Sequence, residues 1–300
     1  MEHRGERIRL PSLKLQSYVD MFFIMLFGNN QDLVIFTSSN LVAFISIYLF
    51  NRFLKIYNLA QSPLFSTILY CFGPFFGTLY KISPTGDNLF FCLILLSFIF
   101  FKNNNYLLNF ITITISTYCR VESFILIFIF IILYIIKKER IPIALYVFGS
   151  ITVVFLLIKF GIYKRNFANN LNLKTDNIGL LLGEYPLQEL FKNFISIENL
   201  RTIHGLFCFY AINLFSIITL YEKSLPLFLA ASIWFFFSLF FRNEAAMRFM
   251  YPFETIALIS AADKLFTTRF SRLLIIPFLF VYVPTSVVYL SKVGVISYNS

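Results

Sequence analysis

Long apolar runs separated by short polar segments make up most of the chain. The runs are continuously apolar, without the alternation of apolar and polar residues that the strands of a membrane barrel show, so they predict helices. Several are shorter than the roughly 20 residues of a perpendicular membrane-crossing helix, and neighbouring helices would bury those. The pattern predicts an all-α polytopic transmembrane helix bundle of about 10 spans. The predicted spans are residues 33–50, 64–80, 88–101, 106–119, 121–136, 141–163, 206–221, 225–241, 246–262 and 271–290.

Two segments depart from this pattern. Residues 17–27 are apolar but short for a span and contain Asp20, so they predict an amphipathic helix lying in the membrane interface. Residues 164–205 form the only long hydrophilic stretch, and loops of that length are usually functional or disordered. The predicted division is an N-terminal segment, a first bundle part, a lumenal loop and a second bundle part, at residues 1–32, 33–163, 164–205 and 206–300.

Composition supports a membrane protein. Apolar residues make up 58% of the chain and charged residues only 13%. In soluble domains about half of the residues are apolar and about a quarter are charged. The formal charge is +10, but no basic stripe with interleaved aromatic residues indicates nucleic-acid binding. The four cysteines lack the spacing of a zinc site or a disulfide framework and are predicted to be small buried apolar residues.

Basic residues predict the orientation of the chain. If residues 33–50 cross first from the non-cytoplasmic side, every cytoplasmic loop carries Lys or Arg, as the positive-inside rule requires. The opposite orientation would place the basic residues of 137–140 and 263–272 outside. The remaining polar segments then share one lumenal or extracellular face, at residues 81–88, 116–124, 164–205 and 241–248.

Arg120 and Glu122 are the most specific candidates for a site. They stand in a short turn between two predicted spans, and ionisable groups near membrane depth tend to face a polar cavity and mark function. The structural alternative is a helix-end pair at headgroup level, with Glu122 favoured by the dipole of the following helix. Asp87 follows Ser-Pro-Thr-Gly directly before an apolar run, which is typical of a helix cap.

The stretch FRNEAAMRFMYPF, residues 241–253, places Arg248 at the membrane boundary, where a lipid phosphate would lie. Arginine suits bidentate phosphate contacts, and the alternatives are snorkelling or an (i, i+4) pair with Glu244. His204 stands beside an apolar run and, with only His3 as a second histidine, indicates no metal site. The sequence contains no phosphate-binding glycine loop, dinucleotide fingerprint or hydrolase nucleophile motif.

Four stretches carry a family resemblance in chain order: EHRGERIRLPSL, SPTGDNLFFCLILL, CRVESFIL and FRNEAAMRFMYPF. Together they resemble the polytopic glycosyltransferases of the GT-C superfamily, and most of all the dolichyl-phosphate-mannose-dependent α-mannosyltransferases of glycosyltransferase family 22. In the first stretch, Glu2-His3 stands in the place of the family's Asp-His. In the second, Asn88 matches the family's asparagine and Pro84 stands where the family has arginine.

The last two stretches carry the charged residues of the resemblance. CRVESFIL is similar to the Phe-Arg-x-Glu-Leu turn of the branch that adds an α-1,6-mannose to the lipid-linked N-glycan precursor. The fourth stretch resembles His-Lys-Glu-x-Arg-Phe-x-x-Pro, without the histidine. Its matching residues are Glu244, Arg248, Phe249 and Pro252.

One part of the family pattern is missing from the sequence. Family members carry a first transmembrane helix and then a lumenal loop with an acidic catalytic base, and this sequence begins downstream of both. The resemblance leaves three alternatives: an N-terminally truncated chain, a substitute base at Glu2 or Glu6, or an inactive protein.

The resemblance implies an inverting mannosyltransferase of the endoplasmic reticulum membrane, a multi-pass protein. Its donor would be dolichyl phosphate mannose and its acceptor a lipid-linked oligosaccharide or a GPI precursor, with membrane lipids around it and no cofactor or metal. Arg120 or Arg248 would stabilise the leaving phosphate, and Glu122 would orient Arg120 or bind sugar hydroxyls. The substrate-binding candidates are His3, Asp87, Asn88, Arg120, Glu122, His204, Glu244 and Arg248.

The alternative function is non-catalytic. A polytopic lipid or glycan transporter, or an accessory subunit of a glycosyltransferase complex, would have the same composition. Transporters tend to show repeated halves, broken helices and polar groups near the bilayer midplane. The predicted charged turns lie at one face instead, which favours a site at the membrane surface.

Overall fold

The computed structural model describes residues 14–28, 30–72, 87–120, 123–159, 213–238 and 243–267. Contacts divide the chain into two units with a boundary in the last turn of α2, and each unit is described by itself. Unit 1 contains the helices α1 (Lys14–Phe27), α2 (Gln31–Tyr57), α5 (Asp87–Lys102), α6 (Tyr106–Cys119), α7 (Phe124–Ile136) and α8 (Arg140–Lys159). Unit 2 contains α3 (Pro63–Phe72), a helix over 213–223, α13 (Leu225–Ser238) and α14 (Asn243–Thr267).

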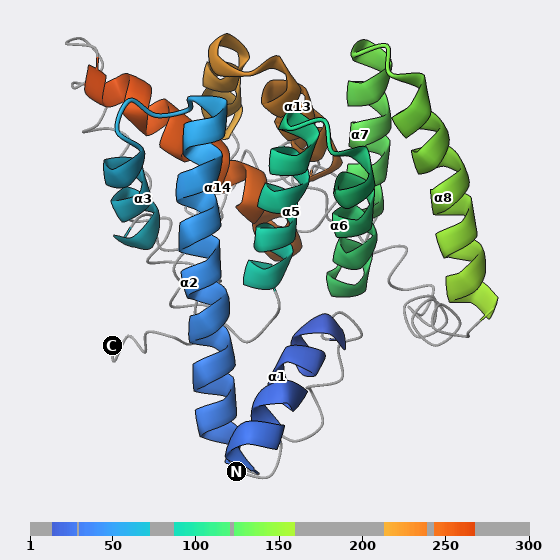
Figure 1. Ribbon diagram of the computed structural model, residues 1–300. Coiled ribbons are helices and arrows are strands. Elements are labelled where there is room, and N and C mark those ends of the chain that lie inside the picture. The colour runs from blue at the N-terminus through green and yellow to red at the C-terminus, as the bar shows by residue number, and fades with distance from the viewer. Residues whose placement is uncertain are drawn as a thin grey trace, which may run out of the picture. The chain divides into compact units, whose positions relative to one another are not determined.

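These elements confirm the all-α class. The described residues form helices and turns without a strand (Figure 1). None of the helices in the described part of the chain has both the length and the apolar character required to cross a membrane. The predicted transmembrane spans and domain boundaries therefore stay predictions, and the predicted segments at 164–205 and 271–290 lie outside the described residues.

Asparagines begin two of the helices in unit 1. The Asn30 side chain accepts a hydrogen bond from the Leu33 amide at 3.2 Å, and the Asn105 side chain accepts one from the Leu108 amide at 3.3 Å. Asparagine at the N-cap satisfies one of the amides that the first helical turn leaves without an intrahelical partner. The starts of α2 and α6 are therefore set locally by the sequence.

The core of unit 1 is built around α5. Most of its side chains are buried, including Phe90, Phe91, Ile94 and Phe98. Rings from α2 and α7 pack on it, with centroids 6.0 Å apart for Phe50 and Phe91 and 4.9 Å apart for Phe98 and Phe130. A helix that is apolar on all sides is stable where neighbours cover every face, which is the position of α5. Cys92 and Cys119 are buried here with free thiols, as predicted, whereas Cys71 on α3 is only half-buried and Cys208 lies outside the described residues.

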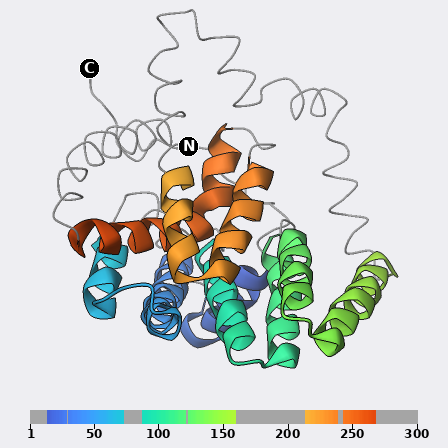
Figure 2. The ribbon, with the colours of Figure 1, turned by 90° about the horizontal axis from the view of Figure 1, so that it is seen from above.

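Helices α5 to α8 run up and down beside one another (Figures 1 and 2). Residues 103–105 join α5 to α6, and residues 137–139 join α7 to α8. The Lys137 ammonium donates to Asn104 Oδ1 at 3.0 Å and lies 4.0 Å from the Phe101 ring centroid, so these two turns adjoin. We call this the hairpin end of unit 1, and the opposite end, where α5 starts and α6 finishes, the Arg120 end.

Burial affects the ammonium group at the hairpin end. Desolvation lowers the pKa of Lys137, and the nearby Glu139 carboxylate opposes that shift. The attraction to the Phe101 ring and the hydrogen bonds to Phe101 O and Asn104 Oδ1 compensate for the lost water contacts. Lys137 is therefore part of the packing of this end and not only a surface charge.

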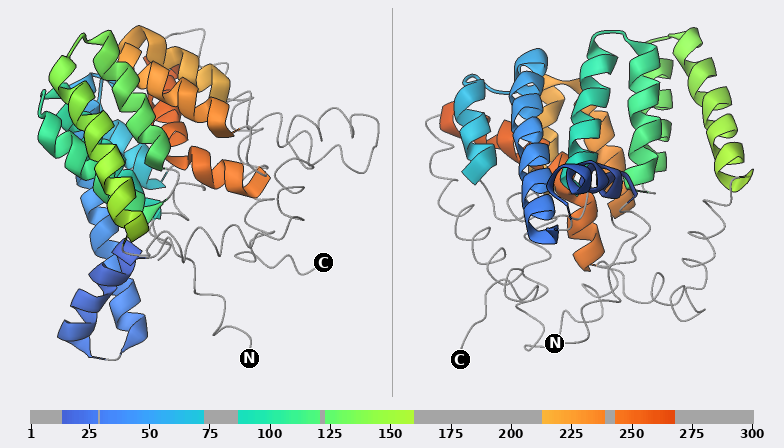
Figure 3. Two further views of the ribbon diagram at one scale, coloured as in Figure 1. Left: turned by 90° about the vertical axis from the view of Figure 1, so that its right-hand side faces the viewer. Right: turned by 60° about the horizontal axis from the view of Figure 1, so that its bottom comes forward.

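Helix α1 lies against the rest of unit 1 at the Arg120 end. It contacts α6 and turns back beside the start of α2 (Figure 3). Ser38, which is fully buried on α2, donates its hydroxyl to Asp20 Oδ1 on α1 at 2.6 Å. The helix predicted at 17–27 is thus present and begins three residues earlier than predicted. Asp20, the charged residue within it, links α1 to α2.

Gly149 allows α8 to approach α6 closely. A Cβ at this position would lie 2.4 Å from an atom of the Phe110 ring. Small residues let helix backbones come together, so the glycine is explained by this crossing.

Unit 2 packs α13 and α3 against α14. Trp234 on α13 is fully buried, with its ring centroid 5.2 Å from that of Phe253 on α14. The described side chains of α14 are almost all buried, so α14 is the central helix of this unit, as α5 is of unit 1. Pro252 stands inside α14 and has no amide to donate to the carbonyl one turn earlier.

Candidate functional site

Arg120 and Ser123, which flank the connection between α6 and α7, both form hydrogen bonds to the end of α6. Arg120 is the C-cap of α6 in an extended conformation, and its amide donates to Ser116 O at 3.0 Å. The Ser123 amide donates to Arg120 O at 3.1 Å, and the Ser123 hydroxyl donates to Ser116 O at 2.8 Å. These bonds fix the backbone that carries the Arg120 side chain, and both serines are fully buried.

Arg120 forms a buried ion pair with Asp87. The distance from Arg120 Nη1 to Asp87 Oδ1 is 3.1 Å, and the two side chains are 7% and 0% exposed. The Arg120 guanidinium carbon also lies 5.5 Å from the centroid of the Phe90 ring, one turn further along α5. A carboxylate in the first turn of a helix is favoured by the helix dipole, and here it also receives a charge-assisted hydrogen bond.

Because the pair is buried, loss of either partner is costly in folding free energy. Two charges removed from water lose hydration that their attraction only partly restores, whereas removing one partner leaves a buried charge and costs about 3–5 kcal/mol. The pair therefore couples the start of α5 firmly to the end of α6. It brings together two segments that are 33 residues apart in the chain.

Three of the predicted site residues meet at the Arg120 end of unit 1. Asp87 and Asn88 occupy the first turn of α5, Asn88 is buried, and Arg120 reaches Asp87 from the end of α6. The resemblance implied that Glu122 orients Arg120 or binds sugar hydroxyls, and among the described residues Asp87 forms an ion pair with the guanidinium. Glu122 itself lies outside the described residues.

The other candidates are placed less fully. Glu244 and Arg248 lie in the first two turns of α14, in unit 2, with one helical turn between them. The remaining predicted residues lie outside the described part of the chain: Glu2, His3, Glu6 and His204.

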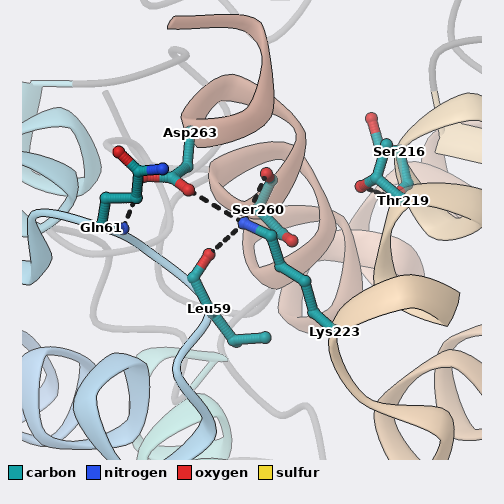
Figure 4. Close-up of polar contacts among 7 residues, drawn as sticks. All are labelled: Leu59, Gln61, Ser216, Thr219, Lys223, Ser260 and Asp263. Carbon is teal, nitrogen blue, oxygen red and sulfur yellow. Dashed lines mark hydrogen bonds and ion pairs between the residues drawn. The ribbon is translucent and has the colours of Figure 1, made fainter. Parts of the chain in front are cut away.

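Unit 2 has a polar cluster that the sequence did not predict (Figure 4). The Lys223 ammonium lies 3.0 Å from Asp263 Oδ2 and also donates to Leu59 O and, at 3.3 Å, to Ser260 O. The Gln61 amide donates to Asp263 Oδ1 at 2.8 Å. The cluster joins the end of the 213–223 helix, the segment before α3 and the last turns of α14, and its contacts are those of a structural fastening.

Glu254 is a further residue that sequence reasoning missed. It is 3% exposed on α14, two residues after Pro252. The sequence could have indicated it, because a carboxylate inside an otherwise apolar run often marks a functional site in membrane proteins. Lys223 and Asp263 had a weaker signal, since charges at the ends of apolar runs are common.

The described residues hold no group of three or more His, Cys, Asp or Glu side chains that could bind a metal ion. The Arg120 end offers instead a guanidinium in a fixed direction, which is suited to an anionic oxygen. Comparison of the chain with known protein families, with characterised proteins and with solved structures found no match.

Proposed function

We propose that the chain is a multi-pass mannosyltransferase of the endoplasmic reticulum membrane that transfers mannose from dolichyl phosphate mannose to a lipid-linked glycan. The observation that carries the proposal is the Asp87–Arg120 ion pair. It joins two of the four stretches on which the family resemblance rests, SPTGDN and CRVESF, at one end of one unit.

Exposed apolar side chains support a membrane environment. Phe36 and Phe44 on α2 and Phe148 on α8 are each about 70% exposed, and Ile141 on α8 is 77% exposed. Soluble proteins rarely present large apolar side chains over whole helix faces, whereas lipid-facing helices do. The outward faces of α2 and α8 are therefore suited to lipid.

The two ends of unit 1 support the predicted orientation. The hairpin end carries Lys102, Lys137, Lys138 and Arg140, all assigned to cytoplasmic loops, and the Arg120 end carries the residues assigned to the lumenal face. The positive-inside rule would orient such a unit with its hairpin end in the cytoplasm. The site would then lie on the lumenal side, where dolichyl-linked glycans are extended.

The proposed reaction needs an anion-stabilising group and a base. The acceptor hydroxyl attacks the anomeric carbon of mannose, the bond from that carbon to the dolichyl phosphate oxygen breaks, and the configuration inverts. Arg120, with Arg248 as a second candidate, would stabilise the charge that develops on the departing phosphate. A carboxylate, with Glu2 and Glu6 as candidates, would accept the hydroxyl proton.

A transfer assay tests this proposal. Microsomes containing the full chain would be supplied with radiolabelled dolichyl phosphate mannose and either a lipid-linked oligosaccharide or a GPI precursor. We expect mannose transfer to one acceptor, and a fall of at least about 10-fold in the variants Arg120→Gln and Arg248→Ala, because a lost anion-stabilising donor costs that much or more.

A matched control distinguishes the loss of a positive charge anywhere in the chain from the loss of an arginine in the proposed site. Arg140→Gln removes an exposed arginine at the hairpin end, and its transfer rate should equal that of the wild type. Absence of transfer by the wild-type chain to either acceptor, or full transfer by Arg120→Gln, would contradict the proposed function.

A further inference from the structure

Asp87 is a predicted site residue that forms an ion pair with another predicted site residue. Its side chain has no exposed surface, and its Oδ1 atom lies 3.1 Å from Arg120 Nη1. From sequence, Asp87 is either a helix cap or a ligand for substrate. The ion pair gives this carboxylate a third use.

We propose that Asp87 is a positioning residue, which holds the Arg120 guanidinium in the direction required for the donor phosphate and makes no contact with substrate itself. This inference rests on the proposed function. It replaces the expected direct role of Asp87 in substrate binding.

The geometry around Arg120 supports this role. Hydrogen bonds with Ser116 and Ser123 fix its backbone, and Asp87 holds its Nη1 atom. Its guanidinium carbon lies over the Phe90 ring, 5.5 Å from the centroid. An arginine side chain has many rotamers, so a productive direction must be imposed by neighbours. A guanidinium has five N–H donors in a planar fork and can serve more than one anionic acceptor.

Charge balance supports it as well. A buried arginine without a counterion would be costly in the free protein and would bind any phosphate tightly, including the dolichyl phosphate product. Asp87 neutralises Arg120 while the site is empty. The interaction of Arg120 with the donor is then strongest in the transition state, when extra negative charge develops on the leaving phosphate. Catalysis requires such a difference from the ground state.

Kinetics of Asp87→Asn test the role. The substitution keeps the shape and an acceptor oxygen but removes the charge that orients Arg120. We expect kcat to fall by about 10- to 100-fold, since misplacement of a group by about 1 Å costs rates of that order. The KM values for donor and acceptor should change less than about twofold, because a lost transition-state interaction lowers kcat and kcat/KM together.

A double variant distinguishes positioning from direct contact. If Asp87 acts only through Arg120, Asp87→Asn combined with Arg120→Gln should transfer mannose at the rate of Arg120→Gln alone. A further fall in the double variant, a raised KM with unchanged kcat, or wild-type kinetics in Asp87→Asn would each overturn the proposal.

Asp263→Asn is the matched control. It removes the carboxylate of the Lys223–Asp263 ion pair, and neither of these residues is among the proposed site residues, so it lowers stability by the same kind of change and should retain wild-type kcat. A fall of kcat in Asp263→Asn equal to that in Asp87→Asn would show that the effect is general destabilisation and would overturn the positioning role.

A readout without activity keeps this inference separate from the proposed function. The melting temperature in detergent should fall by roughly 10 °C in Asp87→Asn and in Arg120→Gln, and no further in the double variant, since both break one pair. If the wild-type chain transfers no mannose but the melting temperatures of the variants are non-additive in this way, the proposed function is wrong and the Asp87–Arg120 interaction is still supported. Independent, additive shifts would show that Asp87 does not hold Arg120.

Discussion

Asn109 is the most heavily used polar side chain in the core of unit 1. Its Oδ1 atom accepts the hydroxyl of Tyr134 at 3.0 Å and the hydroxyl of Tyr146, and its Nδ2 atom donates to Ser97 O at 2.6 Å. All of these groups are buried. One amide therefore connects α5, α6, α7 and α8, and the hydroxyls of Tyr134 and Tyr146 would lose this acceptor without it.

Asn109→Leu should destabilise the protein by about 2–5 kcal/mol, because it leaves two buried hydroxyls without an acceptor at about 1–3 kcal/mol each. Tyr146→Phe removes one donor and should cost only about 1 kcal/mol. The measurement is reversible unfolding of the purified chain in detergent. Asn103→Ala, at an exposed position in the α5–α6 turn, serves as the control, and equal stability of Asn109→Leu and wild type would contradict this assignment.

Residues of the site were predictable one at a time but not as a pair. Asp87 and Arg120 were identified because each is a charge beside an apolar run, which is costly without a partner. Their pairing depends on the antiparallel packing of α5 and α6, and nothing local encodes that contact.

At the scale of elements, the same turn closes both helical hairpins of unit 1. In the first, the Asn105 amide donates to Phe100 O at 2.9 Å and the Asn104 amide to Phe101 O at 3.2 Å. In the second, the Glu139 amide donates to Tyr134 O and the Lys138 amide to Ile135 O, both at 3.0 Å. This is the Schellman arrangement, which requires a left-handed residue just past the helix end. Asn104 and Lys138 hold that position, with φ of 56° and 60°.

Lys138→Gly should stabilise the protein by about 0.5–1 kcal/mol, because a side chain with a Cβ pays for the left-handed conformation and glycine does not. Lys138→Ala removes the same charge but keeps the Cβ, so it should give little or no gain. Asn104→Gly should gain less than Lys138→Gly, since asparagine tolerates this conformation. Thermal unfolding of the three variants measures the difference, and a gain in Lys138→Ala equal to that in Lys138→Gly would assign the effect to charge.

The apolar pattern predicted the ends of a helix accurately where polar residues directly bound the apolar run. The run at 106–119 is bounded by three asparagines and by Arg120, and α6 spans the same residues. The run at 121–136 predicted a helix three residues too long at its start, because Ser123 is used in the turn onto α6. The grouping of α3 with α14 in unit 2 follows from contacts such as Gln61 with Asp263, which lie 202 residues apart, and no pattern in the sequence marks them.

At the scale of the whole molecule, the contacts within each unit constrain which loops share a side. Lys137 touches Asn104, so the turns 103–105 and 137–139 belong to one end of unit 1. In unit 2, Lys223 at the end of the 213–223 helix and Asp263 in the last turns of α14 contact residues 59–61. The charge pattern assigned the basic residues in or beside these three segments to one side. The segments that these contacts bring together are thus the ones whose basic residues share one side in the predicted topology.

Glycosylation tags with flexible linkers test that topology directly. A tag inserted in 164–205 should be modified in the endoplasmic reticulum, because the segment is predicted to be lumenal. Tags at 103–105 and at 137–139 should both stay unmodified, since these adjoining turns carry or flank the basic residues that favour the cytoplasm. Sensitivity to an endoglycosidase reads out each tag, and an untagged chain controls for natural acceptor sites. The reverse pattern would overturn the orientation, whereas modification of only one of the two turns would contradict the hairpin end itself.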